Sequence, residues 1–384
     1  MALCQGLFLT NNVTFIAING LVGLSLAPLG WMATLPVMGY VVGGALSTGL
    51  VAKSQSKWGR RTSFQLGLAV ACFSACAAAW CIVVGSFWGL VAATVVAGYY
   101  SANGQLYRFA AAELAMPAFK EKAVSLVLAG GLIGAIVGPN LAARSRNLLS
   151  LPFAGAYVVL AGVALLAMVI MAFIQFPPNE TPAKGKGGGR PLLEILRQPV
   201  FLVPCICAAL GYGVMNLLMA ATPLAMQQCG LSFDDTALVL EWHVIGMFAP
   251  GFFTGSLIKR WGTLPIMAVG IALNLACVLI ALTGVELHQF VIALFLLGVG
   301  WNFLFTGSTT LSLNAYRPEE KDRAQATINF CVFAVTAVTS LASGALVTTQ
   351  GWNLLNAGSL LPLVLTAVAL GWLGWQQRKN PRLA

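Results

Sequence analysis

The sequence predicts an all-α membrane protein in which twelve transmembrane helices form two pseudo-symmetric six-helix bundles. The chain is 59% hydrophobic and only 8% charged, and its mean hydropathy is +0.85. Twelve apolar runs reach the length of about 20 residues that a helix needs to cross the bilayer core. A basic loop recurs at the same place in each half, 203 residues apart, which indicates a duplicated bundle.

The twelve runs are interpreted as helices, because none alternates polar and apolar residues as the strands of a membrane barrel do. The longest polar stretch, 177–199, contains a Gly-rich and Lys-rich segment typical of a flexible linker. It divides the chain into an N-terminal bundle, 1–176, and a C-terminal bundle, 200–384, and residues 191–198 within it have the spacing of a short surface helix. The predicted spans are 4–26, 31–52, 63–84, 87–107, 123–143 and 153–175 in the first half, and 200–224, 236–257, 263–284, 289–312, 324–346 and 354–375 in the second.

The basic residues orient the spans. When twelve spans are threaded from a cytoplasmic N-terminus, 19 of the 21 Lys and Arg residues fall on the cytoplasmic side. Only Arg144 and Arg146 fall on the other side. Cytoplasmic loops are enriched in Lys and Arg, so both termini are expected in the cytoplasm. The net charge of +10 then follows from topology and from anionic lipid at the inner face, and no compact basic domain indicates a nucleic-acid partner.

Two pairs of loops show the duplication. Residues 56–61 read Ser-Lys-Trp-Gly-Arg-Arg after the second span, and residues 259–263 read Lys-Arg-Trp-Gly-Thr after the eighth. A second pair, 117–123 and 318–324, leads into spans 5 and 11 at an offset of 201 residues. Two loop pairs at nearly one offset predict homologous halves, which are typical of secondary transporters.

With these motifs, essentially the whole chain resembles the major facilitator superfamily. That family's loop between spans 2 and 3 reads Gly-x-Leu-Ala-Asp-Arg-x-Gly-Arg-Arg, and the matching run here is 52–61. The chain departs from it at Ala52, where the family has glycine, and at Ser56, where the family has aspartate. In the second half Gly255 is kept, but Lys259 stands at the aspartate position. The resemblance implies that the two loops form part of an inner gate, through Lys57, Gly59, Arg60 and Arg61 in one half and Lys259, Arg260 and Gly262 in the other.

In the family, these basic residues close the inner gate as a latch with acidic helix ends. Glu113, at the end of span 4, is the expected partner in the first half, and Glu319 or Glu320 in the second. Because the family carboxylate is missing from both loops, we expect a latch that is weaker or that uses Glu113 more heavily. Loops on the cytoplasmic side are basic in any case, so simple orientation in the membrane is the alternative interpretation.

Span 5 carries glycines at a spacing of four residues. Gly130, Gly134 and Gly138 place bare backbone on one helix face, which allows close packing in lipid, and Pro139 allows a bend. Static packing is one interpretation. The resemblance implies another, because in exporters of the family this segment seals the outer interface between the halves, although Ala142 and Ala143 stand here where the family has glycines. Span 8 has a similar run: Gly246, Pro250, Gly251 and Gly255.

Ionisable side chains inside spans are energetically costly and are candidates for proton coupling. Glu241 lies about two turns into span 8, and His243 follows two residues later, a spacing that does not bring side chains together on a helix. Histidine titrates near neutral pH, although a neutral imidazole bonded between helices is the alternative. Arg108, at a membrane edge, is the third candidate, and its long stem can also reach the lipid headgroups.

The placement of tryptophan indicates a substrate site. Most tryptophans fall near the two membrane interfaces, whereas Trp301 stands near the middle of span 10. Polar faces lie on spans 1, 4, 7 and 10, which line the central cavity in the family, although hydrogen bonds between helices are the alternative interpretation. Since buried charge is scarce, the pattern favours a neutral or zwitterionic, partly aromatic solute. The candidate binding residues are Asn12, Asn19, Tyr100, Asn103, Tyr107, Tyr212, Asn216, Trp301, Asn302 and Thr306.

Together these features predict a proton-coupled secondary transporter of a small organic solute. The span-5 run favours export by antiport, while uptake of a nutrient, vitamin or siderophore-type solute by symport stays open, with a membrane sensor as a third alternative. No nucleotide-binding or hydrolytic motif is found, so an enzyme is not expected. Neither a cofactor nor a metal site is expected. The expected partners are solute, protons and lipid, for a monomer in the plasma (bacterial inner) membrane.

Overall fold

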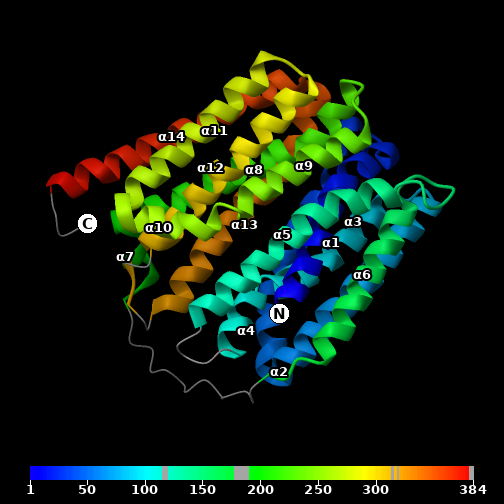
Figure 1. Cartoon of the computed structure of the whole chain (residues 1–384), viewed down its shortest axis with the longest axis horizontal. Helices are drawn as coiled ribbons and strands as arrows, with labels where there is room; N and C mark the ends of the chain where they lie inside the picture. Colours follow the sequence, from blue (N-terminus) through cyan, green and yellow to red (C-terminus); the bar gives the residue numbers. More distant parts are fainter. Residues whose placement is uncertain (115–119, 177–189, 313–314, 318–319, 380–384) are drawn as a thin grey trace.

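The structure is a computed structural model that describes residues 1–114, 120–176, 190–312, 315–317 and 320–379. The described part consists of helices joined by short turns, so the predicted all-α fold is confirmed. Figure 1 shows long helices lying side by side in an elongated bundle. The helices are α1 Ala2–Leu26, η1 Gly30–Met32, α2 Leu35–Val83, α3 Phe87–Gly104, α4 Tyr107–Leu114, α5 Lys120–Ser145, α6 Ala154–Ala172, α7 Leu192–Leu196, α8 Pro199–Gln228, α9 Phe233–Phe248, α10 Gly251–Trp261, α11 Thr263–Thr283, α12 Leu287–Ser312, α13 Lys321–Thr349 and α14 Gly351–Lys379.

Most predicted spans are long apolar helices in the structure. Within the described residues, 9 helical segments are long and apolar enough to cross a membrane, and α9 with α10, bent by 42°, makes a tenth. The two other predicted spans, 87–107 and 123–143, coincide with α3 and α5, which are not among these ten. The architecture is that of a membrane helix bundle, and the count of twelve spans stays a prediction.

The two repeated basic loops are much shorter than the sequence suggests. Spans 31–52 and 63–84 join into the single element α2, interrupted at Gly59, where φ is 83° and ψ is 167°. Gly262, between α10 and α11, has nearly the same conformation, with φ 88° and ψ 161°. A residue with a Cβ is strained at such φ values, so glycine is required at both turns. The flanking Lys, Arg and Gln residues are good helix formers, which lets the helices run up to the turn.

The bundle divides into two groups of helices. Figure 1 shows α1–α6 on one side and α8–α14 on the other. Between the groups, α5 packs against α9, α2 and η1 pack against α13, and α1 packs against α8. One apolar cluster includes residues of both groups, among them Phe15 and Tyr40 of the first and Trp301 of the second. The predicted short helix near residues 191–198 is present as α7, while residues 177–189 of the linker lie outside the described residues.

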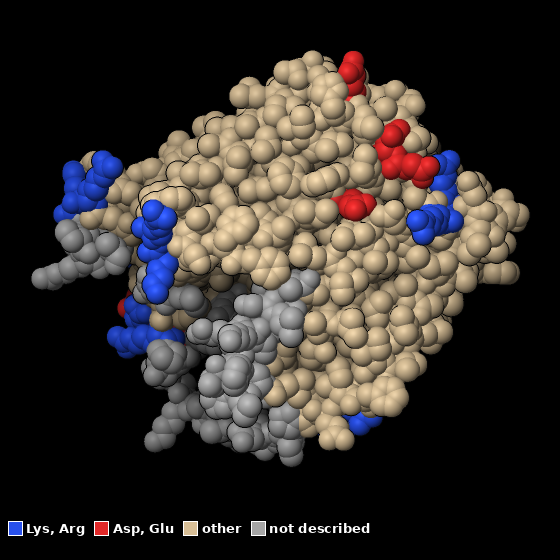
Figure 2. All heavy atoms as spheres, viewed as in Figure 1, with Lys and Arg blue, Asp and Glu red and all other residues tan. Residues whose placement is uncertain are grey.

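Charged side chains gather toward the two ends of the bundle. One end carries the repeated basic turns and the end of α14, with Lys259 and Arg378 in last helical turns, and is called the basic-loop end. The opposite end carries η1, Arg146 and the acidic first turn of α9, and is called the Arg146 end. Figure 2 shows acidic side chains toward the upper right, next to basic ones, and further basic side chains at the left and bottom. The apolar belt between them is the surface that lipid would cover.

Candidate functional site

The structure surrounds Trp301 of α12 with aromatic rings from three helices. Its indole stacks on Phe305, with ring centroids 5.2 Å apart and an interplanar angle of 11°. Tyr212 of α8 and Phe248 of α9 contact it edge to face, at 5.5 Å and 6.3 Å. Trp301 is 8% exposed, so it lies within the bundle. Its Nε1–H is buried and finds no hydrogen-bond acceptor among the described residues, which leaves a donor available to a ligand.

The aromatic cluster, Tyr212, Phe248, Trp301 and Phe305, is buried at Trp301 and half-buried at its three other rings. On α8 every residue of 213–226 is buried, whereas Tyr212 is half-buried. On α12, Phe305 and Thr306 are half-buried and Thr309, one turn further, is exposed. The edge of the cluster at Tyr212 and Phe305 is therefore partly exposed, whereas the α8 residues that follow Tyr212 are enclosed. Of the predicted substrate residues in this region, Tyr212 and Thr306 are half-buried and Trp301 is buried.

Asn12 of α1 is a further predicted substrate residue with an unsatisfied group. Its side chain is half-buried, and its Oδ1 is buried without a hydrogen-bond donor in the part of the chain that the structure describes. A buried amide oxygen without a donor is costly, so this atom is a candidate acceptor for a ligand or water.

Three other predicted asparagines are engaged by neighbouring helices. The Asn19 Nδ2 donates to the Phe15 carbonyl at 2.7 Å, and its Oδ1 accepts from the Tyr157 hydroxyl at 2.9 Å. Asn103 accepts from Ser63 at 3.1 Å and donates to the Tyr99 carbonyl at 3.0 Å. These contacts correspond to the alternative interpretation of the polar stripes, hydrogen bonding within and between helices. Asn216 likewise donates to three oxygens of α13: the Thr336 carbonyl and the hydroxyls of Thr339 and Ser340.

Asn302 connects α12 to both sides of the bend in span 8. Its Nδ2 donates to the Met247 carbonyl near the end of α9, at 2.7 Å. Its Oδ1 accepts from the Thr254 hydroxyl of α10, also at 2.7 Å. Pro250 lies between these contacts and lacks an N–H, so the bend interrupts the helical ladder. Asn302 thus holds the two arms of the bend, next to Trp301 in sequence.

Tyr100 and Tyr107 lie inside the first helix group, away from Trp301. Both are at most 1% exposed and pack edge to face on Phe8, at 5.3 Å and 6.0 Å. Neither hydroxyl has a hydrogen-bond partner among the residues described. Tyr100 also lines a small cavity with Asn11, Tyr40 and other residues of α1, α2, α3 and α6. The predicted stripe of span 4 therefore faces the interior of its own group.

The structure separates Glu241 and His243, the two residues of α9 predicted to carry protons. Glu241 is half-buried, and its Oε2 accepts from the Asn140 amide of α5 at 2.8 Å, a contact between the two helix groups. His243 is fully buried, with Nδ1 2.7 Å from the Leu294 carbonyl. Its Nε2 has no partner in the described part of the chain. The sequence prediction that the two side chains do not pair agrees with this arrangement. The Arg108 side chain lies outside the described residues.

The basic gate residues contact their own helix group. Arg61 donates to the carbonyl of Ala172, the last residue of α6, and Arg60 donates to Gln55 at 2.6 Å. A cation near a helix C-terminus complements the helix dipole. Lys57 and Arg260 each lie over the neighbouring tryptophan ring, and Lys259 is exposed.

Of the expected acidic latch partners, Glu320 is occupied elsewhere. It accepts from the Arg190 guanidinium at 2.7 Å and 2.9 Å, and from the Arg190 and Arg317 backbone N–H groups. These bonds lower the pKa of the Glu320 carboxyl well below its usual range. Glu320 therefore fastens the end of the linker to the loop before α13. The side chains of Glu113 and Glu319 lie outside the described residues.

The span-5 glycines face α1, which belongs to the same helix group. A Cβ at Gly134 would lie 2.5 Å from the Leu9 Cβ, and one at Gly138 would lie 3.0 Å from the Val13 Cβ. Thr14 donates to the Gly138 carbonyl at 2.8 Å, next to Pro139. At Gly131, which the sequence did not single out, an added Cβ would lie 3.7 Å from the Phe248 ring of the other group. The contacts of Gly134 and Gly138 lie within one helix group and correspond to the packing interpretation, while their role in sealing the interface stays a prediction.

Three contributors to the site are absent from the sequence predictions. Phe305 lies four residues after Trp301, and this spacing on a helix face is a signal that the sequence did contain. Phe248 reaches Trp301 through the packing of α9 on α12, and Asn140 reaches Glu241 through the packing of α5 on α9; no local pattern reveals either contact. Within the described residues, no group of three or more His, Cys, Asp and Glu side chains could hold a metal ion.

Comparison with known proteins places this architecture in a family. The family model of the Major Facilitator Superfamily matches residues 1–281 and 204–384. A riboflavin transporter, RfnT of Brucella anthropi, is 37% identical over 374 residues, which are 95% of this chain and 94% of that protein. YdeG of Bacillus subtilis, an uncharacterized MFS-type transporter, is 28% identical over 92% of this chain and 86% of its own length.

A solved structure shows the same fold at low sequence identity. The human organic anion transporter MFSD10 matches with a TM-score of 0.67 and 15% identity, over 96% of this chain and 98% of that chain. At this identity the match supports the fold alone. The family model and the 37% identical relative each cover nearly the whole chain, and they agree with the helix bundle described above. The chain therefore belongs to the major facilitator superfamily of membrane transporters.

Proposed function

We propose that this protein transports a planar aromatic solute of the riboflavin class across the plasma membrane by alternating access. The observation that carries the proposal is the aromatic cluster around Trp301, with its unpartnered indole N–H. A stacked pair of rings offers a flat apolar face, and a buried donor beside it suits a heteroaromatic ring that carries acceptors. The 37% identical relative is named a riboflavin transporter, which supports the same class.

In the proposed binding mode, the solute contacts α8 and α12 of the second group and α1 of the first. Trp301 and Phe305 would stack on the solute, and Tyr212 would contact its edge. Asn12, with a free amide oxygen, would accept a hydrogen bond from the first group. Asn302 would hold the bend of span 8 without contacting the solute, since both ends of its amide are engaged.

We propose uptake as the direction of transport. Export is favoured if the span-5 glycines seal the interface between the halves, whereas their contacts with Leu9 and Val13 favour packing within one half. The two helix groups, 1–176 and 200–384, would rock against each other, with the basic-loop end in the cytoplasm as the distribution of Lys and Arg predicts. The protein would act as a monomer with both termini in the cytoplasm.

Glu241 is the proposed proton carrier. Its carboxylate lies at the contact between α5 and α9, where the Asn140 amide donates to it across the interface. A charge that appears or disappears at this contact changes the stability of the closed interface, which is what proton coupling requires. His243 is fully buried on the contact between α9 and α12, so its role would be to tie these helices.

The test is riboflavin binding by the purified protein and by Trp301→Ala. Loss of one aromatic stacking partner costs about 1–3 kcal/mol, so Kd should rise roughly 5- to 150-fold. Trp301→Phe keeps an aromatic ring and should retain most of the affinity. Trp372→Ala is the matched control, because that side chain is 41% exposed on the outer surface of α14. Equal affinity of Trp301→Ala and Trp372→Ala would refute the proposed site, and absence of binding to the native protein would refute the solute class.

A further inference from the structure

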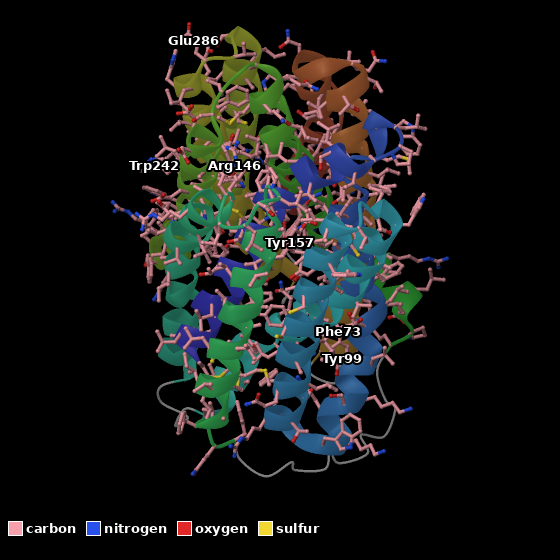
Figure 3. All side chains as sticks on the ribbon, turned by 90° about the vertical axis from the view of Figure 1, so that its right-hand side faces the viewer. Phe73, Tyr99, Arg146, Tyr157, Trp242 and Glu286 are labelled. Atoms are coloured by element: carbon pink, nitrogen blue, oxygen red, sulfur yellow. The ribbon has the colours of Figure 1, made fainter. Side chains whose placement is uncertain are left out.

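At the Arg146 end, one cation lies against two aromatic rings that belong to different helix groups. The Arg146 guanidinium carbon is 5.8 Å from the Phe153 ring centroid and 5.5 Å from the Phe233 ring centroid. The two rings meet edge to face, with centroids 5.4 Å apart. Phe153 directly precedes α6, and Phe233 is the first residue of α9, so the cluster joins the groups. Figure 3 looks toward this end of the molecule and labels Arg146.

The backbone of Phe153 is strained. Its φ is 67°, and among the described residues it is the one position other than glycine with a positive φ. Aromatic side chains rarely adopt this conformation, which tends to occur at switch regions and functional sites. The Phe153 N–H donates to the Arg146 carbonyl at 2.7 Å, so the strained residue is tied to the cation that contacts its ring.

Arg146 is only partly satisfied in this arrangement. The side chain is half-buried, and its Nε is buried without a hydrogen-bond acceptor in the described residues. An unpaired buried donor lowers the stability of the closed arrangement, so this end can open at a smaller cost in free energy. Phe233 is held more firmly, because Ser232 and Asp235 form a capping box at the start of α9. We therefore expect Arg146 and Phe153, rather than Phe233, to move when this end opens.

Other contacts at the same end show that the interface is closed. The Gly344 N–H of α13 donates to the Thr34 hydroxyl, just before α2, at 3.0 Å. A Cβ at Gly30 would lie 3.8 Å from Thr348 of α13. These contacts close the far side of the interface from Arg146. They involve neither a charge nor a strained backbone, and they offer no comparable means of switching.

We propose that Arg146, Phe153 and Phe233 form a switchable seal, which closes this end of the pathway while solute exchanges at the basic-loop end. The proposal rests on the transport function proposed above, because an alternating-access protein has to open this end in each cycle. On opening, Arg146 leaves both rings and Phe153 leaves its strained φ, so relief of strain offsets part of the lost attraction. Arg146 is a positioning residue for the gate and does not contact the solute.

The test uses cysteine accessibility in protein reconstituted into nanodiscs, where a maleimide reaches both ends. Ala220→Cys, in a background without the native cysteines, reports on the closed half, because Ala220 lies in the buried outer part of α8 near Gly20 of α1. Thr309→Cys reports on the basic-loop end. Arg146→Gln and Phe233→Ala should raise labelling at 220 by about 2- to 30-fold, the range that a cation–π contact supports, and lower it at 309.

Matched variants separate the seal from general stability. Arg144→Gln makes the same charge change two residues away on an exposed side chain and should leave both labelling rates unchanged. Arg146→Lys and Phe233→Tyr keep a cation and a ring and should restore most of the closed population. Unchanged labelling at 220 in Arg146→Gln, or a joint rise at 220 and 309 that signals loosened structure, would overturn the proposal. No solute is present, so failure of the riboflavin assignment would not affect this outcome.

Discussion

Asn302 should stabilise the bend in span 8, because its one amide group bonds to both arms of the bend. In Asn302→Ala, the Met247 carbonyl loses its donor from α12 and the Thr254 hydroxyl loses its acceptor, both at 2.7 Å. Thr254 retains a hydrogen bond to the Pro250 carbonyl, so its hydroxyl stays satisfied. The loss is therefore concentrated at Met247 and in the connection between α12 and the two arms of the bend.

The magnitude follows from the hydrogen bond that is lost at the Met247 carbonyl. Interhelical hydrogen bonds in membrane proteins average about 0.6 kcal/mol and reach about 1.7 kcal/mol. Because Thr254 keeps its bond to the Pro250 carbonyl, the net loss is that of one such bond, about 1–2 kcal/mol in the free energy of unfolding. Because Asn302 is 6% exposed, water cannot readily replace the lost partners. The loss should therefore fall in the upper part of this range.

A reversible denaturant titration in detergent micelles measures this loss. Asn356→Ala is the matched control: Asn356 is fully buried, but its amide donates only to Trp352 of its own helix, at 2.8 Å. Its Oδ1 has no donor among the described residues, so Asn356→Ala breaks no hydrogen bond between helices and should cost less stability than Asn302→Ala. Asn302→Ala and Asn356→Ala with equal stabilities would refute the role assigned to Asn302.

Three further predictions concern packing, charge and coupling. Gly134→Ala should destabilise the protein by about 1–3 kcal/mol in the same titration, because the added Cβ would meet Leu9. Gly162→Ala is the control: the space around Gly162 is open, so this change should be neutral or stabilising, and equal effects of the two changes would contradict the helix contact. Glu320 has a lowered pKa, so its contribution to stability should be complete at pH 7 and lost as the pH falls below about 4.3. The melting temperature of Glu320→Gln should therefore differ from that of the native protein at pH 7 and converge with it in acid, and a difference that stays constant with pH would exclude the ion pair with Arg190. Glu241→Gln should retain riboflavin exchange between equal solutions but lose accumulation driven by a pH gradient, and full accumulation would rule out Glu241 as the proton carrier.

The fold was largely predictable from the sequence, because its strongest determinants are local. Long apolar runs and segregated basic residues follow directly from the bilayer as solvent. The paired turns at Gly59 and Gly262 were also visible, since a conformation with positive φ selects glycine in both halves. The exact extent of the helices was less predictable: α2 continues through the predicted loop up to Gly59, because polar helix formers occupy it.

The site was only partly predictable, because polar residues in a helix bundle can bond to one another or remain open to a ligand. Trp301 was identified from its depth alone, and the structure surrounds it with rings from α8 and α9. Asn19, Asn103 and Asn216 look similar in sequence, but their partners come from helices distant along the chain. The partner of Glu320 was unpredictable for the same reason, since Arg190 reaches it across 130 residues.

Exchange of riboflavin by the purified protein in proteoliposomes tests the central claim most directly. Vesicles loaded with unlabelled riboflavin should transiently accumulate labelled riboflavin from outside. A transporter that exposes its binding site alternately to the two sides of the membrane exchanges solute without an energy source. Vesicles with Trp301→Ala should show little accumulation at the same solute concentration. Binding without exchange would instead indicate a sensor, and would contradict the account of Trp301 as part of a transport pathway.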